Sequence, residues 1–167
     1  MYNIGDKIVY PMHGAGTIEA IEEKKVLGEM NQYYILRMSY DDLKFMFPTQ
    51  GVAVESIRDV ILPQEADKVI DYFNTYIEEV NTNWNKRYRE NAQRIKSGNI
   101  YEVAQVTKML MLRDKKKGLS SGERKMLISA KQILISELVL SKNTTQTDIE
   151  DRLEGIIDDC IKAEQSI

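Results

Sequence analysis

The hydrophobic period of this sequence changes once, at Pro63, and that change constrains the fold more than any other feature. Up to residue 62, short runs rich in aromatic and β-branched residues alternate between apolar and polar positions, as strands do. After Pro63, apolar residues recur at the helical spacings of three and four: Val69, Ile70, Phe73, Ile77 and Val80. The pattern predicts an α+β protein whose two parts meet near residues 60–64.

Residues 1–62 are predicted to form a small β-domain. Four or five short strands, separated by turn-forming segments, favour a strongly bent antiparallel sheet or barrel. The candidate core is Ile8, Tyr10, Ile18, Ile21, Tyr34, Leu36, Leu43 and Phe45. On the predicted strand 43–47, Met46 should point to the face opposite Phe45 and Phe47, where it could form an exposed apolar patch for a partner protein.

Residues 63–167 are predicted to form an all-α bundle of about five helices. Asn99 with Glu102, and Ser120 with Glu123, have the spacing of capping boxes and mark two helix starts. After a first helix that begins near residue 63, the expected helices are 84–96, 99–117, one from about 121 and one from about 147. The connections are short, which is typical of a compact bundle.

Charge is distributed unevenly along a chain whose net charge is only -3. Residues 84–131 contain 13 Lys and Arg against 4 Asp and Glu, a net charge of +9. The flanking segments 63–83 and 132–167 are acidic, with net charges of -4 and -5. A basic block inside an acidic protein indicates a nucleic-acid-binding surface more directly than the overall charge does.

Trp84, the only tryptophan, begins the helix at 84–96 and is followed by Asn-Lys-Arg-Tyr-Arg. Cations can neutralise phosphates, and a flat ring can stack on a base or wedge at a base step. The alternative is that Trp84 fills the bundle core and that the cations form a solvated helix face. Its polar neighbours Thr82 and Asn83 favour an exposed ring. The candidate DNA contacts are Trp84, Lys86, Arg87, Arg89, Arg124 and Lys125.

Neither an enzyme site nor a cofactor is expected. His13 and Cys160 are the only residues of their types, so the sequence offers no disulfide and no metal cluster of these ligands. The Gly14-x-Gly16 pair does not open a helix as a dinucleotide fingerprint would, and a hairpin whose glycines permit positive φ fits better. No apolar run is long enough to span a bilayer, and no signal peptide is recognised, so a cytoplasmic protein without membrane contacts or a small-molecule substrate is expected.

Several segments match a pattern found in known proteins. They are Ile4–Gly16 with Y-P-x-H-G-x-G, Tyr33–Leu36, Thr82–Tyr88, Arg113–Leu127 with R-D-x-x-x-G-L-S-x-G-E, and Ala130–Leu134. Through these segments the sequence resembles the CarD/CdnL family of bacterial transcription regulators over nearly its whole length.

The resemblance implies a Tudor-like β-domain that docks on the β subunit of RNA polymerase. It also implies a helical domain that contacts double-stranded promoter DNA at the upstream edge of the transcription bubble, near the −10 element, and stabilises the open complex. Trp84 would wedge into the minor groove, with basic contacts at Lys86, Arg89 and Arg124. The polymerase contacts would be Lys24, Val26 and Met46. The competing hypothesis is a protein–protein adaptor that docks on polymerase, or a related partner, without touching DNA.

Overall fold

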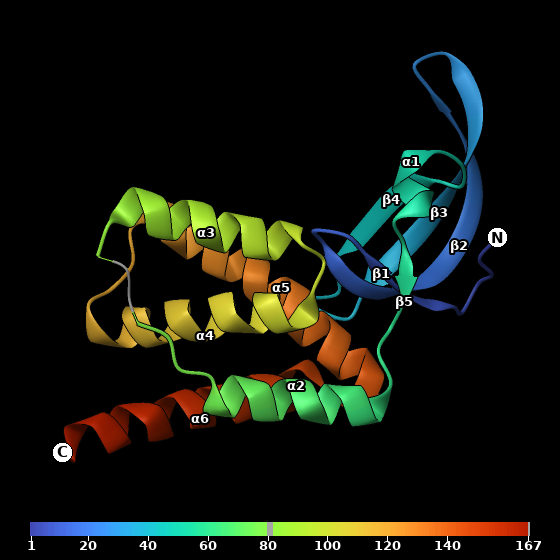
Figure 1. Cartoon of the computed structure of the whole chain (residues 1–167). Helices are drawn as coiled ribbons and strands as arrows, with labels where there is room; N and C mark the ends of the chain where they lie inside the picture. The colour runs from blue at the N-terminus through green and yellow to red at the C-terminus, as the bar shows by residue number, and fades with distance from the viewer. Residues whose placement is uncertain (80–81, 167) are drawn as a thin grey trace.

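The computed structural model describes residues 1–79 and 82–166, which form a five-stranded antiparallel sheet followed by five longer helices (Figure 1). In their order across the sheet, the strands are β4 (Lys44–Pro48), β3 (Glu29–Met38), β2 (Gly14–Val26), β1 (Lys7–Tyr10) and β5 (Arg58–Asp59). The sequence pattern does not predict the short helix α1 (Val52–Glu55) between β4 and β5. The predicted α+β fold class is confirmed.

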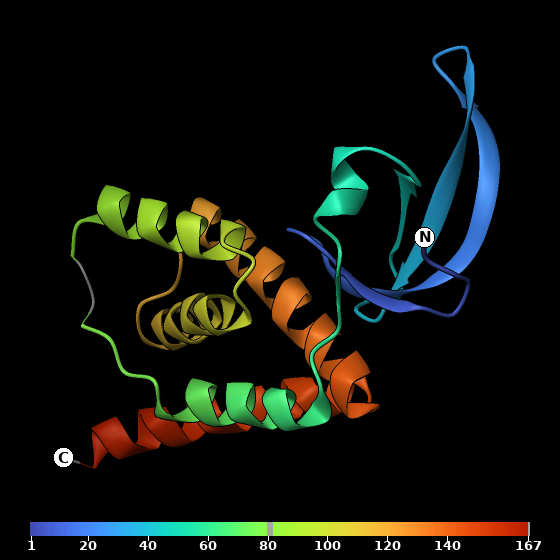
Figure 2. The same cartoon turned by 45° about the vertical axis from the view of Figure 1, so that its right-hand side comes forward.

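The β2–β3 hairpin is long and bent, and it projects beyond the rest of the sheet (Figure 2). Its pairing shifts register between Ile18 and Ala20, and such a bulge increases the local twist. The two expected hairpin glycines are needed for different reasons. Gly14 has a φ of +116°, as expected. Gly16 does not have a positive φ; instead, a Cβ there would lie 2.5 Å from the carbonyl oxygen of Arg37 on β3.

The core of the sheet follows the predicted alternation with one exception. Ile8, Ile18, Tyr34 and Leu36 are buried, and Tyr10, Ile21 and Phe45 pack against them. Phe47 is buried with this cluster, while Met46 is exposed on the opposite face, as predicted. Leu43 is also exposed and is not a core residue. It precedes β4, so the alternation of that strand does not apply to it.

The helical part consists of α2 (Pro63–Thr75), α3 (Trp84–Lys96), α4 (Ile100–Lys116), α5 (Ser121–Lys142) and α6 (Gln146–Gln165). The side chain of Asn99 accepts a hydrogen bond from the backbone N–H of Tyr101, and Ser120 accepts one from Glu123, so both predicted starts carry real caps. Helix α6 begins slightly earlier than predicted because Thr145 is its N-cap residue.

Helix α2 ends earlier than its apolar period predicts. The buried Nζ of Lys108 donates hydrogen bonds to the carbonyl oxygens of Asn74 and Tyr76, at 2.8 and 2.7 Å. A cation at the carboxyl end of a helix satisfies carbonyls that have no partner within the helix. Ile77, expected on the buried face of this helix, therefore lies beyond its end and is 90% exposed. Val80 lies outside the described residues.

The sheet packs directly against α5. The backbone N–H of Ala15 donates to Oγ of Ser136 at 2.8 Å. The carboxylate of Glu137, which is 0% exposed, accepts from both terminal nitrogens of Arg58 at 2.6 and 2.7 Å and from the N–H of Ile61 at 3.0 Å. Helix α5 is thus shared by the sheet and the helical part. No helix in the described ranges has the length and apolar character needed to cross a bilayer.

Candidate nucleic-acid interface

The indole of Trp84 lies at the amino end of α3 and is 42% exposed. The side chain of Asn83 caps the helix by accepting from the N–H of Lys86, which fixes the backbone beside the ring. Nε1 of the indole donates to Oγ of Ser120 at 3.3 Å, and the ring stacks on Tyr88 with centroids 5.1 Å apart. The ring is therefore held at one edge and one face, and it does not fill the core.

The first turn of α5 supports these two rings. A Cβ at Gly122 would lie 3.3 Å from Cε2 of Tyr88 and 3.9 Å from Cζ2 of Trp84. The absence of a side chain lets the two aromatic rings lie against the helix. Glycine inside a helix is otherwise unfavourable, so close packing here gives a physical reason for it.

Glu123 connects this support to two arginines. Its side chain is 2% exposed and lies 3.2 Å from both Oγ of Ser120 and Nε of Arg87, and 3.7 Å from Nε of Arg113. Burial alone would raise the pKa of Glu123. The hydrogen bonds from Arg87 and Ser120 and the charge of Arg87 outweigh burial and hold that pKa below its ordinary value. The carboxylate therefore stays ionised and anchors Ser120, which holds the indole.

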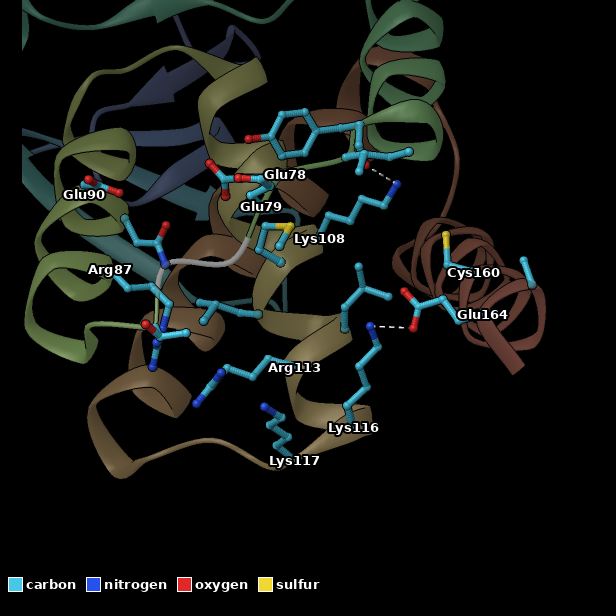
Figure 3. Close-up of a pocket in the computed structure, with 18 residues that line it drawn as sticks. Glu78, Glu79, Arg87, Glu90, Lys108, Arg113, Lys116, Lys117, Cys160 and Glu164 are labelled. Atoms are coloured by element: carbon cyan, nitrogen blue, oxygen red, sulfur yellow. Dashed lines mark hydrogen bonds and ion pairs between the residues drawn. The ribbon is translucent and has the colours of Figure 1, made fainter. Parts of the chain in front are cut away.

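Arg87 occupies a different place from the one expected for a DNA contact. Its side chain is 11% exposed and its Nε is bound to Glu123, so the guanidinium supports the indole from inside the bundle. Arg113 points into the same interior region (Figure 3). A cation already paired with a buried carboxylate has little free charge to offer a phosphate, and we assign Arg87 a supporting role.

The other predicted cations are exposed on α3 and α5, the two helices whose amino ends meet at Trp84. Lys86 and Arg89 are three residues apart on the exposed face of α3, and Lys125 is exposed near the start of α5. Within the described residues, none of these three has an ion-pair partner. Arg124 is 58% exposed and lies 3.9 Å from the carboxylate of Asp114, a distance that allows only a weak interaction.

A cavity of about 630 Å³ lies behind this surface, between α3, α4 and α6 (Figure 3). Met109 and Leu112 contribute apolar lining, and the rim includes Lys117. Glu79 and Thr82 also line it, on either side of residues 80–81, which lie outside the described ranges. We assign no ligand to this cavity. Among the described residues, no group of three or more His, Cys, Asp and Glu side chains is placed to hold a metal ion.

The three predicted polymerase contacts share one face of the sheet. Ala20 pairs with Ile35, and Ile35 pairs with Met46, so these residues point the same way. Alternate residues of a strand lie on one face, so Lys24 and Val26 on β2 lie on the same face as Ala20. Lys24, Val26 and Met46 are all exposed, and Lys24 lies 3.4 Å from the carboxylate of Glu22. Met46 lies on β4, which is an edge strand of the sheet.

Sequence reasoning did not identify the residues that hold the indole. The sequence predicts that Ser120 and Glu123 mark a helix start and that Tyr88 belongs to an aromatic and cationic run, but it predicts no contact of these residues with the indole. The contacts of Ser120 with Trp84 and of Glu123 with Arg87 each join residues 36 positions apart. The spacing of the R-D-x-x-x-G-L-S-x-G-E segment was a signal, because it contains Arg113, Ser120, Gly122 and Glu123 together.

Comparison with known proteins agrees with this arrangement. Residues 2–61 match the model of the CarD-like/TRCF RID domain, and residues 68–154 match that of the CarD C-terminal domain. The chain is 43% identical over 150 residues to YdeB of Bacillus subtilis (strain 168), which is named as a candidate transcription factor. This similarity covers 90% of the chain and 98% of YdeB. The chain therefore belongs to the CarD family of bacterial transcription regulators.

Proposed function

We propose that the protein binds the β subunit of RNA polymerase and promoter DNA together and stabilises the open complex. In this proposal, residues 1–62 form the polymerase-interacting domain and residues 63–167 form the DNA-binding domain. The DNA contact is at the upstream edge of the bubble, near the −10 element. One observation carries the proposal: the indole of Trp84 is exposed, yet it is held in place by Ser120 and Tyr88.

The indole supplies the difference in affinity that such a mechanism needs. A ligand shifts an equilibrium only by binding one state more tightly than the other, and each tenfold shift requires about 1.4 kcal/mol. A ring that wedges where strands separate makes its contacts mainly in the melted state. Because the ring is already held, little conformational entropy is lost when it binds.

The surrounding cations add affinity without reading sequence. Lys86, Arg89, Arg124 and Lys125 are exposed on the two helices that meet at the ring and suit contacts with phosphates. Neutralising phosphates releases counterions, so DNA binding should weaken steeply as salt increases. The proposal therefore attributes promoter selectivity to melting and to the position of polymerase. A sequence-specific footprint made by the protein alone would contradict it.

The polymerase contact is proposed for the outer face of the sheet near β4. This face presents Lys24, Val26 and Met46, and an edge strand has free backbone groups that can pair with a strand of a partner. The match to the CarD-like/TRCF RID domain supports an interaction with RNA polymerase. A protein bound to polymerase in this way would work at the nucleoid, in the cytoplasm.

The decisive measurement is the lifetime of the open complex on a purified bacterial polymerase, with and without the protein. We expect the protein to lengthen it, Trp84→Ala to remove the effect, and Trp84→Phe to keep part of it by retaining a flat ring. Polymerase binding should be equal for all three. If Trp84→Ala lengthens the lifetime as much as the unmodified protein does, the adaptor hypothesis is favoured and the DNA contact is rejected.

A further inference from the structure

The acidic helix α6 runs back to the end of the bundle where Trp84 lies. In both views its carboxyl end is on the side that holds the start of α3 and the end of α4, far from the sheet (Figures 1 and 2). Residues 146–165 contain 7 Asp and Glu against 2 Lys and Arg. A strongly negative segment thus lies beside the most basic part of the molecule.

Carboxylates of α6 pair with lysines of the basic block. Nζ of Lys116 lies 2.6 Å from Glu164, an interaction also drawn in Figure 3. Nζ of Lys115 lies 3.6 Å from Glu154 and 4.0 Å from Asp158. These pairs are partly exposed to solvent, so they are open to competition from other anions.

Other cations of the same block have no such partner. Lys86, Arg89 and Lys125 are exposed and form no ion pair within the described ranges. Helix α6 therefore divides the basic block in two. One set is exposed on α3 and α5 and has no carboxylate partner among the described residues, and the other set, on the last turn of α4, is paired with carboxylates of α6.

We propose that the carboxylates of α6 act as an internal competitor for DNA phosphates and lower the affinity of the free protein for DNA of arbitrary sequence. This inference rests on the proposed function, because it assumes that the Trp84 surface contacts DNA. Of the carboxylates concerned, Asp158 and Glu164 lie beyond residue 154, where the match to the CarD C-terminal domain ends.

The physical basis is counterion release. A lysine that is already paired with a carboxylate must give up that partner before it can neutralise a phosphate and release a cation condensed on the DNA, so it contributes less to DNA affinity and to its salt dependence. Non-specific DNA vastly outnumbers promoter sites in a cell, so reduced non-specific affinity favours the promoter complex. Polymerase then supplies the local concentration that the weakened DNA contact lacks.

The test compares two double variants of the full chain that change the net charge equally on the same helix. Glu154→Gln/Glu164→Gln removes the carboxylates that pair with Lys115, Lys116 and, at 3.8 Å, Lys131. Asp151→Asn/Asp159→Asn removes two exposed carboxylates that form no ion pair in the described part of the chain. Binding to a short DNA duplex of arbitrary sequence is measured over a range of salt concentrations, after thermal unfolding has shown that both variants fold.

We expect Glu154→Gln/Glu164→Gln to bind the duplex about tenfold more tightly at low salt, with a slope of log affinity against log salt that is steeper by about two. The Asp151→Asn/Asp159→Asn variant should change affinity less and leave the slope unchanged. The inference is overturned if both variants gain equally or if neither slope changes. Open-complex lifetime, measured with the unmodified protein, separates this failure from failure of the proposed function, because only the latter abolishes the lengthened lifetime.

Discussion

The two ends of α5 hold their neighbours in opposite ways. Near the sheet, Glu137 is fully buried and makes three hydrogen bonds, to Arg58 and Ile61. At the amino end, Ser120 holds a half-exposed indole by one hydrogen bond of 3.3 Å. Buried, multiply bonded contacts fix geometry, whereas exposed aromatic rings supply binding surface. The comparison teaches that one helix can hold the sheet rigidly and present Trp84 to a partner.

The largest loss of stability is expected from a substitution that breaks the contact between the sheet and α5. Arg58→Leu leaves the carboxylate of Glu137 buried without its counter-charge, which should lower the free energy of unfolding by about 3 kcal/mol in urea denaturation. Arg37→Leu is the matched control, because it removes an arginine paired with the more exposed Glu19 on the sheet and should cost less than about 1 kcal/mol. Equal losses would mean that the Arg58–Glu137 pair does not stabilise the contact between the sheet and α5.

The backbone contact at the same end gives the next largest effect. A Cβ at Gly14 would lie 2.4 Å from Oγ of Ser136 and 3.0 Å from the carbonyl oxygen of Gln132. Gly14→Ala should therefore destabilise the protein by about 2 kcal/mol, through steric overlap and positive φ together. Gly28→Ala is the control. Gly28 also has a positive φ, but a Cβ there would have no atom within 4 Å, so this variant measures only the loss of stability caused by the backbone conformation. A thermal melt in which both variants lose the same stability would contradict close packing at Gly14.

At the other end of α5, Ser120→Ala should cost about 1 kcal/mol by removing an N-cap. It also removes the acceptor of the indole N–H, so the fluorescence of Trp84, the sole tryptophan, should shift to the red and depolarise faster. Thr145→Ala removes the N-cap of α6 and is the control for capping alone. Similar melting with an unchanged emission spectrum in both variants would show that Ser120 does not hold the ring.

The smallest effect is a pH dependence at Glu123. Its pKa is lowered in the folded protein, so its contribution to stability is complete above about pH 4.5 and is lost as pH falls through the folded pKa. Relative to Glu123→Gln, the unmodified protein should lose stability in this acidic range. Parallel pH profiles of unfolding for the two proteins would mean that Glu123 does not stay ionised below the pKa of an unfolded glutamate.

Local rules identified much of this fold from the sequence. The change of period at Pro63, the capping residues Asn99 and Ser120, and the opposite orientations of Met46 and Phe47 all depend on neighbours within a few positions. The errors arose at the boundaries of elements. Leu43 lies just before a strand and Ile77 just after a helix, where a repeating pattern no longer determines which side chains are buried.

The position of the candidate site could be predicted from the sequence, but the contacts between its residues could not. The basic block and Trp84 mark the surface, because charge and residue type are visible in the sequence. The burial of Arg87 against Glu123 and the contact of Gly14 with Ser136 depend on residues 36 and 122 positions apart. Pairings of that kind depend on how helices and sheet pack, and neither propensity nor spacing determines them.

Helix α5 also links the orientation of the sheet to the position of Trp84. From Gly122, beneath the rings, to Glu137, at the sheet, the axis runs roughly 22 Å at 1.5 Å per residue. A tilt of about five degrees at the sheet end would then move the far end by roughly 2 Å, a large fraction of a base-pair step. Under the proposed function, the orientation of the sheet on polymerase would therefore set where the indole meets DNA.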